Sequence, residues 1–140
     1  MNSTFITNSP AETKKIAYDL AQTLNGGEVI AFYGDLGMGK TCFTTGLAEG
    51  LGFTGDVSSP TFAIINEYLG GRLNLYHFDM YRISGWDDLY STGFYDYIDE
   101  GIILAEWSEN IPFAIPREHI SVKIEKDGED KRRITIEEHI

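Results

Sequence analysis

The sequence has one cysteine, four prolines and only 11 basic residues against 22 acidic ones, which gives a net charge of −11. Because Cys42 alone cannot form a disulfide within the chain, we expect a reducing, cytoplasmic location. The excess of negative charge disfavours a surface that binds nucleic acid or anionic lipid through release of counterions. Met1–Lys15 also lacks the basic start and apolar core of a secretory signal.

Long apolar runs are missing as well. Val29–Tyr33 and Ile102–Ala105 fall well below the ~20 residues that a membrane-spanning helix needs, so we expect no contact with a membrane. What is present is the composition of an ordinary soluble globular protein, with 42% hydrophobic and 24% charged residues. A length of 140 residues is typical of one domain, and we predict that residues 1–140 form a single domain.

The first predicted element is a helix from about Pro10 to Leu24. Ser9 can cap this helix, with Pro10 in the first helical position and Glu12 completing a capping box. Apolar residues then recur at helical spacing, at Ile16, Ala17, Leu20, Ala21 and Leu24. Asn25-Gly26-Gly27 is expected to end the helix.

Glu28–Tyr33 is a nearly continuous apolar run, typical of a strand that is covered on both faces. A glycine-rich loop and a second helix follow, and the helix is marked by Phe43, Leu47 and Leu51 and closed by Gly52. The remaining predicted elements are a hairpin of Thr61–Leu69 and Arg72–Asp79, one or two short helices within Ile83–Gly101, a strand Ile102–Trp107, and a strand pair of Ser121–Glu125 and Arg133–Glu137.

These elements predict an α/β fold with a mixed parallel and antiparallel central sheet flanked by helices. If Arg72–Asp79 runs parallel to Val29–Tyr33, its hairpin partner must be antiparallel. The segment after Asp79 is long enough for a crossover that returns Ile102–Trp107 as a parallel strand. Asp79 and Glu106 would then lie at the same edge of the sheet as the loop that follows Tyr33.

The loop between the first predicted strand and the second helix carries a phosphate-binding motif. Gly34-Asp35-Leu36-Gly37-Met38-Gly39-Lys40-Thr41 matches G-x-x-x-x-G-K-[ST] in the strand, loop and helix context that the motif requires. Glycines let backbone N–H groups surround phosphate oxygens, Lys40 reaches the outer phosphates and the Thr41 hydroxyl can bind Mg²⁺. The sequence therefore predicts a P-loop site for ATP with Mg²⁺.

A phosphate loop of this kind works with carboxylates that bind the metal or orient water. We expect Thr41 and Glu106 to be the Mg²⁺ ligands and Asp79 to orient metal-bound or attacking water. The predicted catalytic residues are accordingly Lys40, Asp79 and Glu106. Either carboxylate could instead be an ordinary surface group at the end of a strand.

Three further residues are predicted to contact the nucleotide: Cys42, Thr61 and Arg133. Cys42 directly follows the phosphate loop. Thr61 ends the segment Ser58-Ser59-Pro60-Thr61, which lies where nucleotide-dependent switches sense the third phosphate. Arg133 belongs to Lys131-Arg132-Arg133, which is either a solvated turn or a positive group that approaches the nucleotide.

Four motifs in this order resemble the TsaE (YjeE) family. In chain order they are Tyr33-Gly34-Asp35-Leu36-Gly37-Met38-Gly39-Lys40-Thr41, Ser59-Pro60-Thr61-Phe62, Tyr76-His77-Phe78-Asp79-Met80-Tyr81-Arg82 and Glu106-Trp107-Ser108-Glu109. The resemblance runs through essentially the whole chain. It implies a bacterial ATPase that acts with TsaB and TsaD to make threonylcarbamoyladenosine beside the anticodon of tRNAs.

The resemblance also implies roles for particular residues. The family's phosphate loop corresponds to Gly34–Thr41 and its switch-like motif to Ser59–Phe62. Its acidic positions correspond to Asp79 and Glu106, and its signature tryptophan to Trp107. Family members commonly have Glu-Trp-Pro where this chain has a serine after Trp107. Since the chain is so acidic, we expect contact with tRNA only indirectly, through the partner proteins.

Two other functions stay open at the level of sequence. A small-molecule kinase needs a substrate pocket and usually an arginine-bearing lid, whereas this chain has five arginines and no insertion to build a lid. A non-hydrolysing nucleotide switch or a GTPase is the second alternative, and the Asn-Lys-x-Asp element that reads guanine is missing. His77, inside a predicted strand, is expected to be a packed or hydrogen-bonded core residue.

Overall fold

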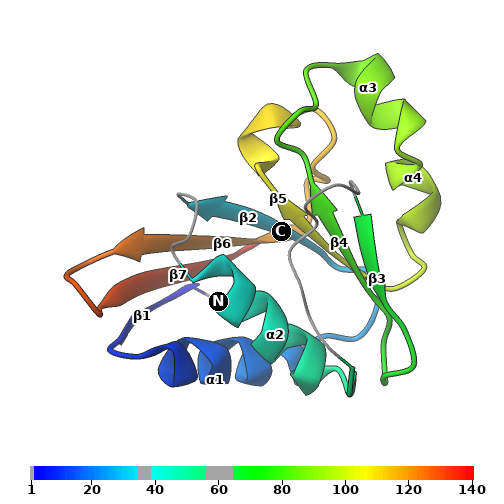
Figure 1. The fold of residues 1–140 in the computed structure, drawn as a ribbon. Helices are drawn as coiled ribbons and strands as arrows, with labels where there is room; N and C mark the ends of the chain where they lie inside the picture. Colours follow the sequence, from blue (N-terminus) through cyan, green and yellow to red (C-terminus); the bar gives the residue numbers. More distant parts are fainter. Residues whose placement is uncertain (1, 35–38, 56–64) are drawn as a thin grey trace.

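The computed structural model describes residues 2–34, 39–55 and 65–140, which form a seven-stranded sheet flanked by helices (Figure 1). The strands are β1 (Asn2–Thr7), β2 (Val29–Gly34), β3 (Ile65–Tyr68), β4 (Leu75–Asp79), β5 (Ile102–Glu106), β6 (His119–Lys126) and β7 (Arg132–His139). The helices are α1 (Pro10–Ala21), α2 (Lys40–Gly50), α3 (Trp86–Ser91) and α4 (Phe94–Tyr97), with a 3₁₀ turn η1 (Ser108–Asn110).

The sheet order is β1-β7-β6-β2-β5-β4-β3. Strands β6, β2, β5 and β4 are parallel neighbours, while β3 pairs antiparallel with β4, β7 with β6 and β1 with β7. The predicted mixed α/β fold is therefore confirmed, including the parallel direction of β4 and β5 and both antiparallel hairpins.

Helix α1 begins as its sequence predicts. The Ser9 side chain accepts a hydrogen bond from the backbone N–H of Glu12 at 3.2 Å, and Pro10 occupies the first turn. The helix ends at Ala21, three residues before the predicted Leu24. Two carbonyls at this end, those of Ala21 and Leu24, accept hydrogen bonds from the Arg72 guanidinium at 2.8 and 3.0 Å.

The hydrogen bonds of Arg72 to α1 also correct the predicted start of the second hairpin strand. Arg72 was expected to start the second strand, but β4 begins at Leu75. The backbone N–H of Arg72 donates to the carbonyl of Leu51, and its side chain reaches α1, so this residue bonds to the helical layer rather than to β3. Because these partners lie 21 or more residues away in sequence, local propensity could not reveal them.

Strand β1 is an element that the sequence did not predict. It pairs antiparallel with β7 from Asn2 opposite Glu137 to Thr7 opposite Arg132. Its length and its polar composition give little periodic signal, and its strand pairing is with a segment near the other end of the chain. Pairing with a distant partner therefore decides that this segment is extended.

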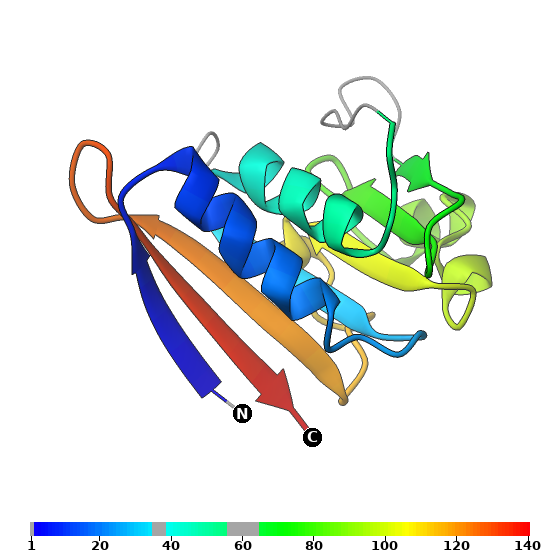
Figure 2. The same ribbon diagram turned by 90° about the horizontal axis from the view of Figure 1, so that it is seen from below.

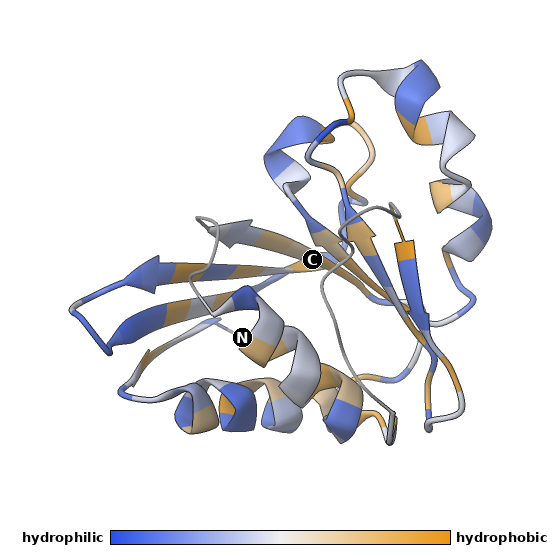
Figure 3. Ribbon diagram, viewed as in Figure 1, coloured by the Kyte–Doolittle hydropathy of each residue, from blue (hydrophilic) through white to orange (hydrophobic). Residues whose placement is uncertain are grey.

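Apolar side chains fill both faces of the sheet. On one face α1 and α2 lie side by side (Figure 2). There Phe43 and Leu47 of α2 pack with Phe32 and Leu104 of the sheet. On the other face the segments after β4 and β5 pack on residues such as Phe78. Hydrophobic residues follow the central strands, while the turn between β6 and β7 is hydrophilic (Figure 3). None of the helices in the described ranges is long and apolar enough to cross a bilayer.

Close approach of α1 to α2 depends on Gly46. A Cβ atom at this position would collide with the backbone carbonyl of Lys14 and crowd Ala17. We expect Gly46→Ala to lower the free energy of unfolding by about 1–2 kcal/mol, although alanine is otherwise the better helix former. Denaturant unfolding measures this change. Thr45→Ala on the same helix is the control, and an equal or smaller loss for Gly46→Ala would contradict the packing argument.

Candidate functional site

Side-chain alternation along the central strands places three polar residues on the face of the sheet that α2 covers. Asp79 lies opposite Glu106 in the β4–β5 register, and Glu106 lies opposite Phe32 of β2. Phe32 belongs to the core cluster shared with α2. Because paired residues of parallel strands point to the same face, Glu106 and Asp79 face the layer of α2, and His77, two residues before Asp79, does so too.

Two glycines of the phosphate-loop motif lie in the described residues, and each has a backbone conformation that favours glycine. Gly34 has φ of 137°, and a Cβ atom on it would collide with the carbonyl of Ile124 on β6. Gly39 has φ of 94° and is the N-cap of α2. The predicted contacts Asp35, Leu36, Gly37 and Met38 lie outside the described residues. So do Thr61 and the rest of the predicted switch motif, Ser59–Phe62.

Lys40 is the first residue of α2 and only 7% exposed. Its Nζ lies 5.1 Å from the centre of the Trp107 ring and 5.9 Å from that of Phe32, both within cation–π range. Among the ion pairs of the described residues, none involves Lys40. The ammonium group thus belongs to the first residue of a helix, and the N-terminal end of a helix dipole also attracts anions.

Trp107 adopts a left-handed backbone conformation, with φ of 59° and ψ of 41°. Such a conformation is uncommon for a large residue and has to be stabilised by its surroundings. The Ser108 hydroxyl donates to the carbonyl of Ala105 at 2.7 Å, and the Tyr81 ring meets the Trp107 ring edge to face at 4.9 Å. Ser108 therefore stabilises this turn through a hydrogen bond that a proline at this position could not make.

Glu106 is buried at the end of β5, with 8% of its surface exposed. Its Oε2 lies 2.9 Å from Nε2 of His77 on the neighbouring strand. His77 is 1% exposed, which agrees with the prediction of a hydrogen-bonded core residue. The pairing of His77 with Glu106 was not predicted. The sequence did contain a signal for it, because His77 and Asp79 are two residues apart, so they share a face of their strand, and the neighbouring strand ends in Glu106.

Asp79 ends β4 beside Glu106 and is half-buried. Its Oδ1 accepts a hydrogen bond from the backbone N–H of Tyr81 at 3.0 Å. The carbonyl of Glu106 in turn accepts from the N–H of Met80 at 3.1 Å, so the ends of β4 and β5 are tied together. The two carboxylates and Lys40 therefore lie at the carboxyl ends of parallel strands, where α/β sheets bind ligands.

Among the described residues, the side-chain oxygens predicted to serve a metal or its water are the Thr41 hydroxyl at the start of α2 and the carboxylates of Glu106 and Asp79. Within residues 2–34, 39–55 and 65–140 there is no cluster of three or more metal-binding side chains. Hydroxyl and carboxylate oxygens are the ligand type that Mg²⁺ prefers, and Mg²⁺ is commonly bound through one or two carboxylates together with nucleotide phosphates and waters. The donor chemistry therefore fits the predicted metal.

Tyr33, near the end of β2, has a raised pKa. Burial is the main cause, and the carboxylate of Glu109 adds to it by disfavouring the phenolate. The phenol is therefore neutral at physiological pH and can act as a hydrogen-bond donor beside the phosphate-loop motif.

A cavity of about 200 Å³ lies beside the N-cap of α2. Its lining comes from the start of α1, the start of α2 and the β6–β7 turn, and comprises Ser9, Pro10, Thr13, Gly39, Cys42, Asp130 and Arg132. The predicted contact Cys42 is thus half-buried and open to this space. Arg132 lines the cavity, whereas the predicted Arg133 lies 3.5 Å from Asp127 in an ion pair.

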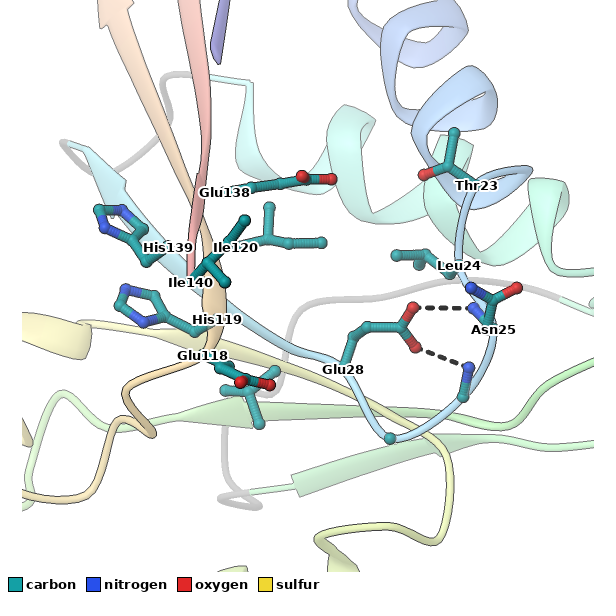
Figure 4. A pocket seen from close by; sticks show the side chains of 13 residues that line it. Thr23, Leu24, Asn25, Glu28, Glu118, His119, Ile120, Glu138, His139 and Ile140 are labelled. Carbon is teal, nitrogen blue, oxygen red and sulfur yellow. Dashed lines mark hydrogen bonds between the residues drawn. The ribbon is translucent and has the colours of Figure 1, made fainter. Parts of the chain in front are cut away.

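A second cavity, of about 480 Å³, lies at the opposite end of the parallel strands (Figure 4). There the Glu28 carboxylate accepts hydrogen bonds from the N–H groups of Asn25 and Gly26, and the rings of His119 and His139 stack 4.2 Å apart. This cavity is next to the residues that begin β2 and β6, whereas ligands of such sheets bind at the strands' carboxyl ends. The cavity in Figure 4 is therefore not where the sequence predicts a nucleotide, and that predicted site falls at the edge that carries Lys40.

Comparison with known proteins identifies the family of this chain. Residues 7–134 match the family described as threonylcarbamoyl adenosine biosynthesis protein TsaE. The chain belongs to the TsaE family. It is 45% identical over 130 residues to the tRNA threonylcarbamoyladenosine biosynthesis protein TsaE of Bacillus subtilis, covering 92% of this chain and 81% of the relative. The TsaE protein of a Nostoc species is 41% identical over 123 residues, covering 84% and 74% of the two chains.

A solved structure supports the fold as well. The crystal structure of Bacillus subtilis YdiB is similar with a TM-score of 0.79 and 42% sequence identity, covering 97% of this chain and 84% of that one. The resemblance to the TsaE family that the four motifs predicted is therefore confirmed. So is the mixed α/β architecture of this TsaE-family chain.

Proposed function

We propose that this chain binds and hydrolyses ATP with Mg²⁺ and acts, with TsaB and TsaD, in the threonylcarbamoyladenosine modification of tRNA. The observation that carries the proposal is the position of Lys40. Its buried ammonium group lies at the N-terminus of α2, next to the strand end that carries Glu106, in a chain of the TsaE family. Such an arrangement is what phosphoryl transfer requires, because catalysis there is mostly positioning and charge stabilisation.

Each residue has a distinct role in this proposal. Lys40 and the N–H groups at the start of α2 stabilise negative charge on the outer phosphates. Thr41 and Glu106 hold Mg²⁺, which when bound neutralises phosphate charge. Asp79, tied to the N–H of Tyr81, orients water at the same edge. Trp107 and Phe32 exclude bulk water from the Lys40 ammonium group, which strengthens its attraction to phosphate.

Phosphate release by the purified protein tests the proposal. We expect measurable, Mg²⁺-dependent hydrolysis of ATP, with slower use of GTP, and a faster rate when TsaB, TsaD and tRNA are added. Binding of ATP without hydrolysis under all these conditions would favour a nucleotide switch. Transfer of the phosphoryl group to a small molecule would favour a kinase.

The charge of the chain leads to a separate prediction about tRNA. We expect the isolated protein to bind tRNA more weakly than micromolar at near-physiological salt, because a net charge of −11 repels a phosphate backbone. The one compact basic segment is partly neutralised, since Arg133 pairs with Asp127. Filter binding or fluorescence anisotropy with labelled tRNA measures this affinity.

The same measurement with TsaB and TsaD present provides the comparison. Recruitment to that complex should weaken as salt rises, because an acidic protein is steered to a positive partner surface by screened electrostatic forces. Micromolar or tighter binding of tRNA by the isolated protein would contradict the prediction. Recruitment to TsaB and TsaD that does not change with salt would show that electrostatic attraction to the partners is not what guides the association.

A further inference from the structure

His77 is a buried polar residue that is only partly hydrogen-bonded. Its Nε2 contacts Glu106 at 2.9 Å, but its Nδ1 is buried and finds no partner in the described part of the chain. An unsatisfied buried polar atom of this kind lowers the stability of the folded state, and such exceptions in a folded protein call for an explanation.

Stability does not explain this pair. His77 sits in the middle of β4 between the buried residues Tyr76 and Phe78, and opposite Leu104 of β5. Replacing both members of a buried polar pair by well-packed apolar residues is often neutral or stabilising, so two apolar side chains at positions 77 and 106 would serve the sheet at least as well. The imidazole is therefore expected to contribute something other than stability.

The contact has a direct consequence for Glu106. A glutamate side chain has three rotatable bonds, so the backbone at the end of β5 does not by itself fix the position of the carboxylate. The imidazole, on a rigid central strand and with two rotatable bonds of its own, fixes Oε2. Fixing one carboxylate oxygen sets the direction of the other, Oε1.

We infer that His77 is a positioning residue that holds the Glu106 carboxylate in the orientation in which it binds a nucleotide-bound divalent cation. This inference rests on the proposed function, in which Glu106 is a Mg²⁺ ligand. Partners that hydrogen-bond to metal-binding side chains orient them, and loss of such a partner typically weakens metal affinity about 10- to 100-fold. A neutral imidazole can donate from Nε2 without adding a positive charge that would compete with the cation, which a lysine or arginine could not do.

Titration of Mg²⁺ into protein saturated with ADP tests this inference, because it reports on metal binding without any turnover. We expect His77→Phe, which keeps the ring and removes the donor, to weaken Mg²⁺ binding about 10- to 100-fold. His77→Gln, whose amide N–H can replace Nε2–H, should recover most of that loss. ADP affinity in the presence of EDTA should stay close to wild type in His77→Phe. The thermal unfolding midpoint of His77→Phe should fall, because the Glu106 carboxylate loses its buried partner, and it should recover in His77→Gln.

Two controls separate positioning from a structural effect. Tyr76→Phe removes a polar atom from the same strand without touching Glu106, and it should leave Mg²⁺ affinity unchanged. In a double-mutant cycle, adding His77→Phe to Glu106→Gln should cause little further loss, because the oxygen that His77 orients is no longer a charged ligand.

The outcomes that overturn the inference are distinct from those that overturn the proposed function. Wild-type Mg²⁺ affinity in His77→Phe, together with a clear loss in Glu106→Gln, would remove the role of His77 alone. The role of His77 would also be removed if His77→Phe lowered three quantities together and His77→Gln restored none of them. These quantities are the Mg²⁺ affinity, the ADP affinity in the presence of EDTA and the thermal unfolding midpoint. Wild-type Mg²⁺ affinity in Glu106→Gln would remove Glu106 as a ligand, and the role of His77 with it.

Discussion

Lys40→Ala is expected to reduce ATP turnover by about 10²- to 10³-fold, measured as phosphate release in the presence of TsaB, TsaD and tRNA. The ammonium group is desolvated between the rings of Trp107 and Phe32, so its charge acts on bound phosphate with little screening by water. A methyl group cannot offset the negative charge that builds on the phosphoryl oxygens.

The fold should survive this substitution, because removing a buried charge offsets part of the packing that is lost. Circular dichroism and thermal unfolding check this point. Lys15→Ala is the matched control, since Lys15 is exposed on α1, where its ammonium group pairs with Asp19. Turnover at the wild-type level in Lys40→Ala would remove the phosphate-loop assignment.

Glu106→Gln is expected to weaken Mg²⁺ binding to the nucleotide complex by more than the ~10- to 100-fold that is typical for a residue that only positions a ligand. The substitution keeps the size of the side chain and a group that can accept a hydrogen bond from His77, but it removes the negative charge that attracts the cation. Titration calorimetry with Mg²⁺ and ADP measures the effect directly.

Glu109→Gln provides the control for this second substitution. Glu109 is an exposed carboxylate three residues further along the chain, in the turn that follows β5. We expect little change in its Mg²⁺ affinity. If the two variants lose affinity equally, the effect is one of general negative charge near the site, and Glu106 is not a metal ligand.

Much of the fold could be predicted because its signals are local. The capping residues Ser9 and Glu12, the continuous apolar run of β2 and the two hairpins each depend on neighbours within a few residues. The strand, loop and helix context of the phosphate motif is local too, and α2 begins at Lys40 as the motif requires. The parallel direction of β5 followed from the length of the segment between β4 and β5, which is enough for a crossover.

What escaped prediction depends on distant partners. Strand β1 exists through its pairing with β7, and β4 starts late because Arg72 bonds to carbonyls of α1 and to Leu51. No local pattern distinguishes an arginine that continues a strand from one that binds the end of a helix. Loop closure brings these groups together only when the whole sheet has formed.

The sequence alone determined the residue types that this site needs: a lysine and threonine after a glycine-rich loop, and a carboxylate at the end of each of two apolar strands. The tertiary structure decided how they meet. The β4–β5 register sets Asp79 beside Glu106, strand alternation turns His77 toward the same carboxylate, and the left-handed turn at Trp107 brings its ring to Lys40. These contacts join residues 29 and 67 positions apart in the chain, and only sheet pairing and the packing of α2 bring them within a few ångströms.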